Sequence, residues 1–254
     1  MSLLMEHMIG LTDTAYLGRV GEVELGASAL AGVYYLVIYM LGFGFSIGAQ
    51  VLIARRNGAQ EYKRIGPVFL QGTFFLLLLA ALLFTFSHLY SPFFLRKLID
   101  SDGVYQATME YVDWRVYGFF FSFVAVMFRA FYVGITKTRI LTINSVVMVL
   151  TNVMLNYVLI FGKFGLPALG IAGAAMATAM GQIVGGAVPL VYVLRNNSSS
   201  LRLRRPKWDG GALRRACTNG ISELMSSISM SIVGMLYNAQ LMLSLILISE
   251  PTRL

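Results

Sequence analysis

Long uncharged segments alternate with short charged ones along this chain. The five longest uncharged runs are Leu25–Ala54, Ile65–Leu95, Ile140–Gly162, Phe164–Leu194 and Leu224–Ser249. A helix of about 20 apolar residues is long enough to cross the hydrocarbon core of a bilayer. With the apolar segments at the N-terminus and before residue 134, the pattern predicts seven membrane-spanning helices: Met1–Gly18, Ala29–Ala54, Gly66–His88, Tyr111–Val133, Ile140–Phe161, Gly170–Leu194 and Glu223–Leu245.

Composition supports a membrane protein. Hydrophobic residues make up 57% of the chain and charged residues only 13%. Soluble domains carry about 25% charged residues, so this chain lacks the polar surface that a water-facing globule needs. The expected fold class is an all-α membrane protein that crosses the cell inner (plasma) membrane several times.

The net charge of +8 reflects membrane topology. The three connections after the second, fourth and sixth spans hold the larger set of cations: Arg55, Arg56, Lys63, Arg64, Lys137, Arg139, Arg195, Arg202, Arg204, Arg205, Lys207, Arg214 and Arg215. The opposite ends hold Arg19, Arg96, Lys97, Lys163 and, at the mouth of the fourth span, Arg115. Cytoplasmic loops are enriched in Lys and Arg, so the first set is predicted to face the cytoplasm, and nucleic acid is not an expected partner.

The polar stretch Arg195–Arg215 divides the chain. Six predicted helices in residues 1–194 form an N-terminal membrane lobe, residues 195–222 form a basic cytoplasmic linker with Cys217 in it, and residues 223–254 begin a second lobe. Many secondary transporters consist of two repeated halves. The first span is short for a bilayer, so we expect the chain to be truncated at both ends, with a non-native tail after residue 242.

Asp13 is the first candidate site residue. A carboxylate within a membrane helix costs about 2.5–3.5 kcal/mol on insertion scales, so it is expected to face a cavity, a partner or a bound cation. The alternative is an acid that caps the outer loop or pairs with Arg19. Glu6 shares a helix face with Asp13, and Glu6 and His7 are either part of a proton relay or lie among the lipid headgroups.

The fifth span carries three asparagines on one helical stripe. Asn144 is predicted to pack against a neighbouring helix, while Asn152 and Asn156 are predicted to line a cavity. Arg129 is interpreted as snorkelling to the cytoplasmic interface. Glu223 opens the seventh span, where the helix dipole favours an acid, so a transport role is the weaker interpretation.

Small residues recur at intervals of three and four in GFGFSIGAQ and GIAGAAMATAMGQIVGGA, which predicts closely packed helix pairs. The sequence shows no phosphate-binding GxxxxGK[ST] loop, no Cys/His metal spacing and no nucleophile elbow, so the chain is not expected to be an enzyme.

Several segments together resemble the multidrug and toxic compound extrusion (MATE) transporters. They are LTDTAYLGRVGEVELGASALAG, GFGFSIGAQVLIARRNGAQ, RAFYVGITKTR, TNVMLNYVLIFGKFGLPALGIAGAAMATAMGQ and NGISELMSSISMSIVGMLYNAQLM. The resemblance implies twelve helices in two lobes and exchange of an organic, often cationic, drug or metabolite for protons or sodium.

The resemblance also implies a cation-binding cluster in the first lobe, made of Asp13, Asn152, Asn156 and Thr178. Asn156 stands where many members carry an aspartate, which leaves Asp13 as the main titratable group and favours protons over sodium. Glu223 lies a turn or more from the acid that some members place in the seventh helix, and that role is not carried over.

The resemblance implies no cofactor beyond the coupling ion, and the expected partners are a small organic substrate and membrane lipid. The full-length protein is expected to be a monomer. Two alternatives stay open: a lipid-linked saccharide flippase of the same superfamily, which a cationic cavity would favour, and a non-transporting membrane scaffold or channel.

Overall fold

The computed structural model describes residues 2–195 and 209–249, with side chains from Met8 to Val191 and in the first turns of the last helix. Within these ranges every regular element is helical. The elements in chain order are α1 (Ser2–Leu17), α2 (Glu22–Gly58), the short 3₁₀ helix η1 (Tyr62–Arg64), α3 (Ile65–Leu98), α4 (Asp102–Val116), α5 (Gly118–Gly134), α6 (Arg139–Phe161), α7 (Gly170–Arg195) and α8 (Gly210–Ser249).

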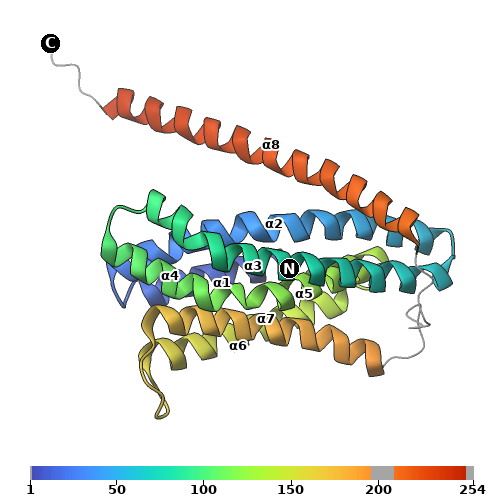
Figure 1. The fold of residues 1–254 in the computed structure, drawn as a ribbon, viewed down its shortest axis with the longest axis horizontal. Coiled ribbons are helices and arrows are strands. Elements are labelled where there is room, and N and C mark those ends of the chain that lie inside the picture. Colours follow the sequence, from blue (N-terminus) through green and yellow to red (C-terminus); the bar gives the residue numbers. More distant parts are fainter. Residues whose placement is uncertain (1, 196–208, 250–254) are drawn as a thin grey trace.

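Helices α1 to α7 form one bundle (Figure 1). By length and composition, four segments of the described chain can cross a membrane: Glu22–Gly58, Tyr62–Leu98, Arg139–Phe161 and Gly170–Val191. Helices α4 and α5 make a fifth span if they are counted as one broken helix, with an angle of 51° between them. The prediction of an all-α, multi-pass membrane fold is confirmed.

The fourth predicted span, Tyr111–Val133, is not one continuous helix. Helix α4 already begins at Asp102, and the break falls between Val116 and Gly118. Glycine is a common site of sharp helix bends. Gly118 also gives Gln182 of α7 room to approach, because a Cβ at this position would collide with the Gln182 side chain. The break therefore lies inside the bundle.

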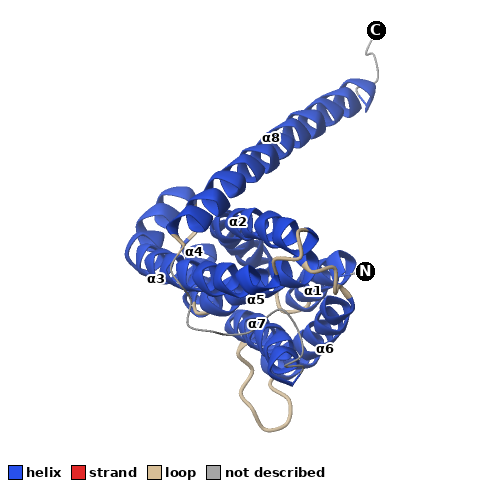
Figure 2. Cartoon of the chain, turned by 90° about the vertical axis from the view of Figure 1, so that its right-hand side faces the viewer, coloured by secondary structure: helices blue, strands red, loops and turns tan. Residues whose placement is uncertain are grey.

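Helix α8 starts on the bundle and then leaves it (Figures 1 and 2). Its first turns lie on α2, where a Cβ at Gly48 would lie 2.6 Å from the Gly220 nitrogen and would also collide with the Ala216 carbonyl oxygen. A Cβ at Gly220 would lie 2.7 Å from the Gly44 oxygen. The predicted close packing at GFGFSIGAQ is confirmed, and this segment packs on the start of α8.

The helical start of α8 corrects the expected linker. Residues 210–222, Cys217 among them, are helical and not part of an extended connection. Asp209 acts as the N-cap, because its Oδ1 accepts a hydrogen bond from the Ala212 nitrogen at 3.1 Å. Arg56 at the end of α2 forms an ion pair with Asp209 at 3.3 Å, which ties the start of α8 to the α2–α3 end of the bundle.

Candidate functional site

Helix α1 places Asp13 against α6 and α7. The ring of Tyr16, one turn further along α1, meets Phe161 of α6 edge-on at 5.8 Å between centroids. Helices α6 and α7 lie close together, because Gly173 has no side chain between its backbone and that of Leu159; a Cβ there would lie 2.7 Å from the Leu159 carbonyl. This packing brings one face of α6 next to one face of α7 beneath Asp13.

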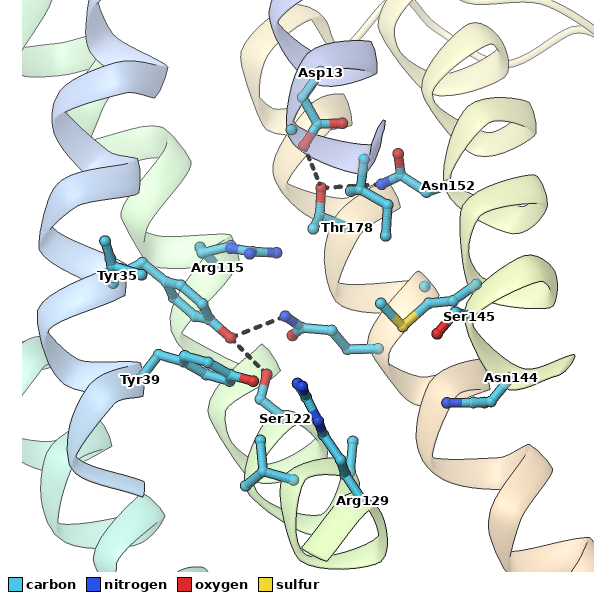
Figure 3. Close-up of a pocket in the computed structure, with 18 of the residues that line it drawn as sticks. Asp13, Tyr35, Tyr39, Arg115, Ser122, Arg129, Asn144, Ser145, Asn152 and Thr178 are labelled. Atoms are coloured by element: carbon cyan, nitrogen blue, oxygen red, sulfur yellow. Dashed lines mark hydrogen bonds between the residues drawn. The ribbon is translucent and has the colours of Figure 1, made fainter. Parts of the chain in front are cut away.

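Four polar side chains from α1, α6 and α7 form one hydrogen-bonded cluster. Asn156 donates from Nδ2 to Asp13 Oδ1 and to Asn152 Oδ1, the latter at 3.0 Å. Thr178 Oγ1 lies 3.1 Å from Asp13 Oδ2, and Asn152 Nδ2 donates to Thr178 Oγ1 at 3.3 Å (Figure 3). Asn152, Asn156 and Thr178 are buried, whereas Asp13 is half-buried. The structure thus brings together the four residues that the resemblance singles out.

The Thr178 hydroxyl has two acceptors within reach. Besides Asp13 Oδ2, the Ala174 carbonyl oxygen lies 2.9 Å from Thr178 Oγ1. A hydroxyl carries a single hydrogen and can also accept a hydrogen bond. Thr178 can therefore donate to an ionised Asp13, or donate to Ala174 and accept from a protonated Asp13.

A cavity of about 360 Å³ opens beside this cluster. Pockets that bind drug-sized ligands usually measure about 300–1,000 Å³. Asp13, Asn152 and Thr178 line its one end, and Arg129, Asn144 and Ser145 lie toward the other (Figure 3). Asp13 is thus exposed to a space in which a small compound fits.

Two arginines line the cavity, and the sequence does not predict this position for Arg115. Arg115 is near the end of α4, where the break turns the chain, and its guanidinium carbon lies 4.0 Å from the centre of the Tyr35 ring. Arg129 of α5 lines the cavity with its guanidinium 5.5 Å from the Phe43 ring centre. Arg115 lies in α4 with its Nη1 buried inside the bundle, so its predicted position at a helix mouth is wrong. The snorkelling of Arg129 stays a prediction.

A network of hydrogen bonds holds Tyr35 in the cavity wall. Its hydroxyl lies 2.5 Å from Ser122 Oγ and accepts from Gln182 Nε2 at 2.9 Å (Figure 3). The Tyr35 ring also stacks on Phe119 at 5.2 Å. The aromatic surface below Arg115 is therefore fixed by contacts to α5 and α7.

The remaining candidate residues lie apart from the cluster. Glu223 is an exposed residue of α8 and does not line the cavity. Glu6 and His7 are in α1, but their side chains lie outside the described residues. Asn144 lies next to Gly185 of α7, in line with the predicted helix packing, and it also lines the cavity; its buried Oδ1 has no hydrogen-bond partner.

Comparison with known proteins identifies the family. The family model described as MatE matches residues 1–158. The chain belongs to the MATE family. The family consists of membrane transporters, so the predictions of a multi-pass membrane protein and of a non-enzymatic chain are confirmed.

Relatives and solved MATE structures agree with this assignment. The chain is similar to a probable multidrug resistance protein NorM of Idiomarina loihiensis, with 27% identity over 216 residues that make up 81% of this chain and 46% of the relative. A NorM protein of Shewanella oneidensis is 30% identical over 177 residues, 69% of this chain and 38% of the relative. An outward-facing multidrug resistance MATE family transporter of the MOP superfamily matches with a TM-score of 0.85 and 19% identity, over 94% of this chain and 52% of that chain. This last likeness concerns the fold alone, and the chain spans less than half the length of these two curated relatives.

Proposed function

We propose that this chain forms one lobe of a secondary antiporter that exports small organic compounds, often cationic, in exchange for protons. The chain covers about half of the MATE structure that it matches, and alternating access in such transporters moves one repeat against the other. The second lobe would supply the opposite wall of the cavity. Asp13 is the proton carrier in this proposal.

The hydrogen-bonding of Asp13 carries the proposal. Both of its carboxylate oxygens accept hydrogen bonds from neutral groups, Asn156 and Thr178, so the ionised form is paired. The protonated form is also paired, because Thr178 can turn its hydrogen to Ala174 and accept from Asp13. A site that satisfies both protonation states suits a group that gains and loses a proton during transport. Asp13 also faces the cavity, where a proton competes with a cationic substrate for the carboxylate.

Sodium is the alternative coupling ion. Hard cations prefer oxygen ligands, and Asp13, Thr178 and the amide oxygens of Asn152 and Asn156 could supply them. The cluster, however, turns the Asn156 nitrogen toward Asp13. Sodium binding would require that amide to turn over, whereas proton binding requires only the rotation of one hydroxyl.

Dye efflux tests the proposal. The complete gene product that contains these residues is placed in proteoliposomes loaded with ethidium, and a pH gradient is imposed without sodium. We expect gradient-driven efflux, and we expect Asp13→Asn to abolish it because the amide keeps the shape but cannot carry the proton. Asp113→Asn is the matched control, since Asp113 is an exposed acid outside the cavity.

Two results would contradict this proposal. Efflux that persists in Asp13→Asn at the wild-type rate would show that Asp13 does not carry the coupling proton. Efflux that follows a sodium gradient at constant pH, and ignores the pH gradient, would assign the site to sodium.

The two arginines favour a second candidate function. A cationic cavity is the feature expected of a lipid-linked saccharide flippase, whose substrate carries phosphate, and Arg115 and Arg129 line this cavity. Translocation of a fluorescent lipid-linked diphosphate without any ion gradient, in the same proteoliposomes, would support this candidate over the antiporter.

A further inference from the structure

The guanidinium of Arg115 has an incomplete set of partners. Its Nη1 is buried and has no hydrogen-bond partner. An arginine carries five N–H donors in a planar fork, and a buried donor without an acceptor is energetically unfavourable. The side chain is nevertheless held in place, with its guanidinium over the Tyr35 ring. A cation fixed on the wall of a cavity and left with a free donor is a binding group for an acceptor.

No ion pair within the described part of the chain neutralises Arg115. The ion pairs there join Arg56 to Asp209, Arg64 to Glu61 and Arg96 to Asp102, all at the ends of helices. Asp13 attracts Arg115 electrostatically, but its hydrogen bonds come from Asn156 and Thr178. These hydrogen bonds to the Asp13 carboxylate thus come from neutral groups and not from Arg115.

Basic residues outnumber acidic residues on the wall of the cavity. Among the described residues that line it, Asp13 is the one acid, against Arg115 and Arg129. Arg115 stays charged whether or not Asp13 carries a proton. A compound whose only charge is positive therefore meets Asp13 as an attractive group and Arg115 as a repulsive one.

We propose that Arg115 binds an anionic group of the transported compound, a carboxylate in the simplest case. This inference rests on the proposed function and specifies the substrate class. A guanidinium pairs with a carboxylate through two parallel N–H···O bonds, and stacking on an aromatic ring fixes its plane. Ser122 and Gln182 hold Tyr35, so the fork is oriented before the ligand arrives.

Protonation of Asp13 should change the affinity of the site for an anion at Arg115 in a predictable direction. Neutralising Asp13 removes the acid that opposes an anion at Arg115, so a compound with only a negative charge binds better to the protonated site. Export in exchange for protons requires the opposite: protonation of Asp13 must weaken the binding of the exported compound. The exported compound therefore carries a cationic group as well, which the proton displaces from Asp13, while its carboxylate stays at Arg115.

Three fluorescent probes that differ in charge test this inference: dansylglycine with a carboxylate, dansylglycinamide without charge, and dansylcadaverine with an ammonium group. Their binding is measured on the complete gene product in nanodiscs, without any gradient, and corrected with empty nanodiscs. We expect dansylglycine to bind more tightly than its amide. Arg115→Gln should weaken dansylglycine at least tenfold, in line with the loss of a charged hydrogen bond, and leave the amide within about twofold.

Control variants separate the site from general effects of charge. Arg96→Gln removes an arginine that also lies over a tyrosine ring, Tyr105, at 5.1 Å, but outside the cavity; it should leave all three affinities unchanged. Arg115→Lys keeps the charge without the fork and should bind dansylglycine with intermediate affinity. Asp13→Asn should tighten dansylglycine and weaken dansylcadaverine.

Several outcomes would overturn the inference. Equal affinity for dansylglycine and its amide in the wild-type protein would do so even if Arg115→Gln failed to fold. Arg115-dependent binding of farnesyl diphosphate without binding of dansylglycine would assign the arginine to a lipid-linked diphosphate. Loss of efflux with intact, Arg115-dependent probe binding would instead contradict the proposed antiport and leave this site standing.

Discussion

Asn156 on α6 donates its side-chain amide to the carboxylate of Asp13 on α1, across 143 positions of sequence. The same amide nitrogen also donates to Asn152 Oδ1. These two contacts fix which end of the amide faces the acid, and the Asn156 oxygen is left buried without a partner. Asn156 is therefore a neutral donor at a position where a second acid would be a competing charge.

Replacing Asn156 by aspartate should make stability depend on pH. Asn156→Asp places a second carboxyl group next to that of Asp13, and two carboxyl groups so close together cannot both ionise without a large energetic cost. We expect the difference in melting temperature from wild type to grow as pH rises from 5 to 8, because repulsion appears only when both acids lose their protons. A difference that stays constant over this range would show that the two side chains do not lie together.

Substitutions at Thr178 should distinguish the effect of its hydroxyl group from the effect of its side-chain volume. Thr178→Val keeps the volume but leaves Asp13 Oδ2 and Asn152 Nδ2 without this partner. Each unpaired buried group costs about 1–3 kcal/mol, so we expect a lower melting temperature and slower pH-driven efflux. Thr178→Ser keeps the hydroxyl and should retain both properties. Equal efflux in the Val and Ser variants would exclude the hydroxyl from proton exchange.

Gly48→Ala should detach the start of α8 from α2, because the new methyl group would collide with the backbone at Ala216 and Gly220. Cys217 reports this contact, as the chain has one cysteine and it is half-buried in α8. Burial raises the pKa of the Cys217 thiol, so detachment should increase the thiolate fraction and speed its alkylation by N-ethylmaleimide. Gly32→Ala, on α2 with open space around it, is the control and should leave the rate unchanged.

The attachment of α8 should also weaken in acid. The Ala212 backbone N–H, helped by the Arg56 guanidinium, holds the pKa of Asp209 below its usual value. The stabilisation that ionised Asp209 gives to the start of α8 is therefore complete at neutral pH. It is lost as pH falls below about 4, the range in which an ordinary aspartate takes up its proton. Amide protection factors in the first turn of α8 should fall in this range. Asp209→Asn should remove this pH dependence, and unchanged protection at low pH in the wild-type chain would contradict the assignment.

The sequence predicts the membrane spans because a bilayer imposes a simple rule on composition. Charged residues are excluded from about 20 consecutive positions, and α2, α3, α6 and α7 follow that rule. The cluster residues were found partly by the same rule, since Asp13 breaks an apolar helix, and partly by resemblance. Hydropathy gives no indication of which helices bring Asp13, Asn156 and Thr178 together.

The features that sequence reasoning missed depend on tertiary packing. The sequence predicts a helix mouth for Arg115 because the apolar segment begins near Tyr111, but α4 starts at Asp102 and Arg115 lies inside it. The Asp-Gly-Gly segment at 209–211 predicts a linker, because glycine favours loops. Aspartate is also a strong N-cap, and here it begins a helix.

The contact of α8 with α2 through Gly44, Gly48 and Gly220 has a mechanical consequence. At Gly48 and Gly220 the two backbones meet directly, and the Leu224 side chain of α8 fills the space over Gly44, so the two helices are held together at this crossing. The contact is a fixed point near the start of α8. The lever arm beyond Gly220 is about 44 Å long at 1.5 Å per residue, so a rotation of about 10° would carry the far end of α8 by about 8 Å while its first turns hardly move.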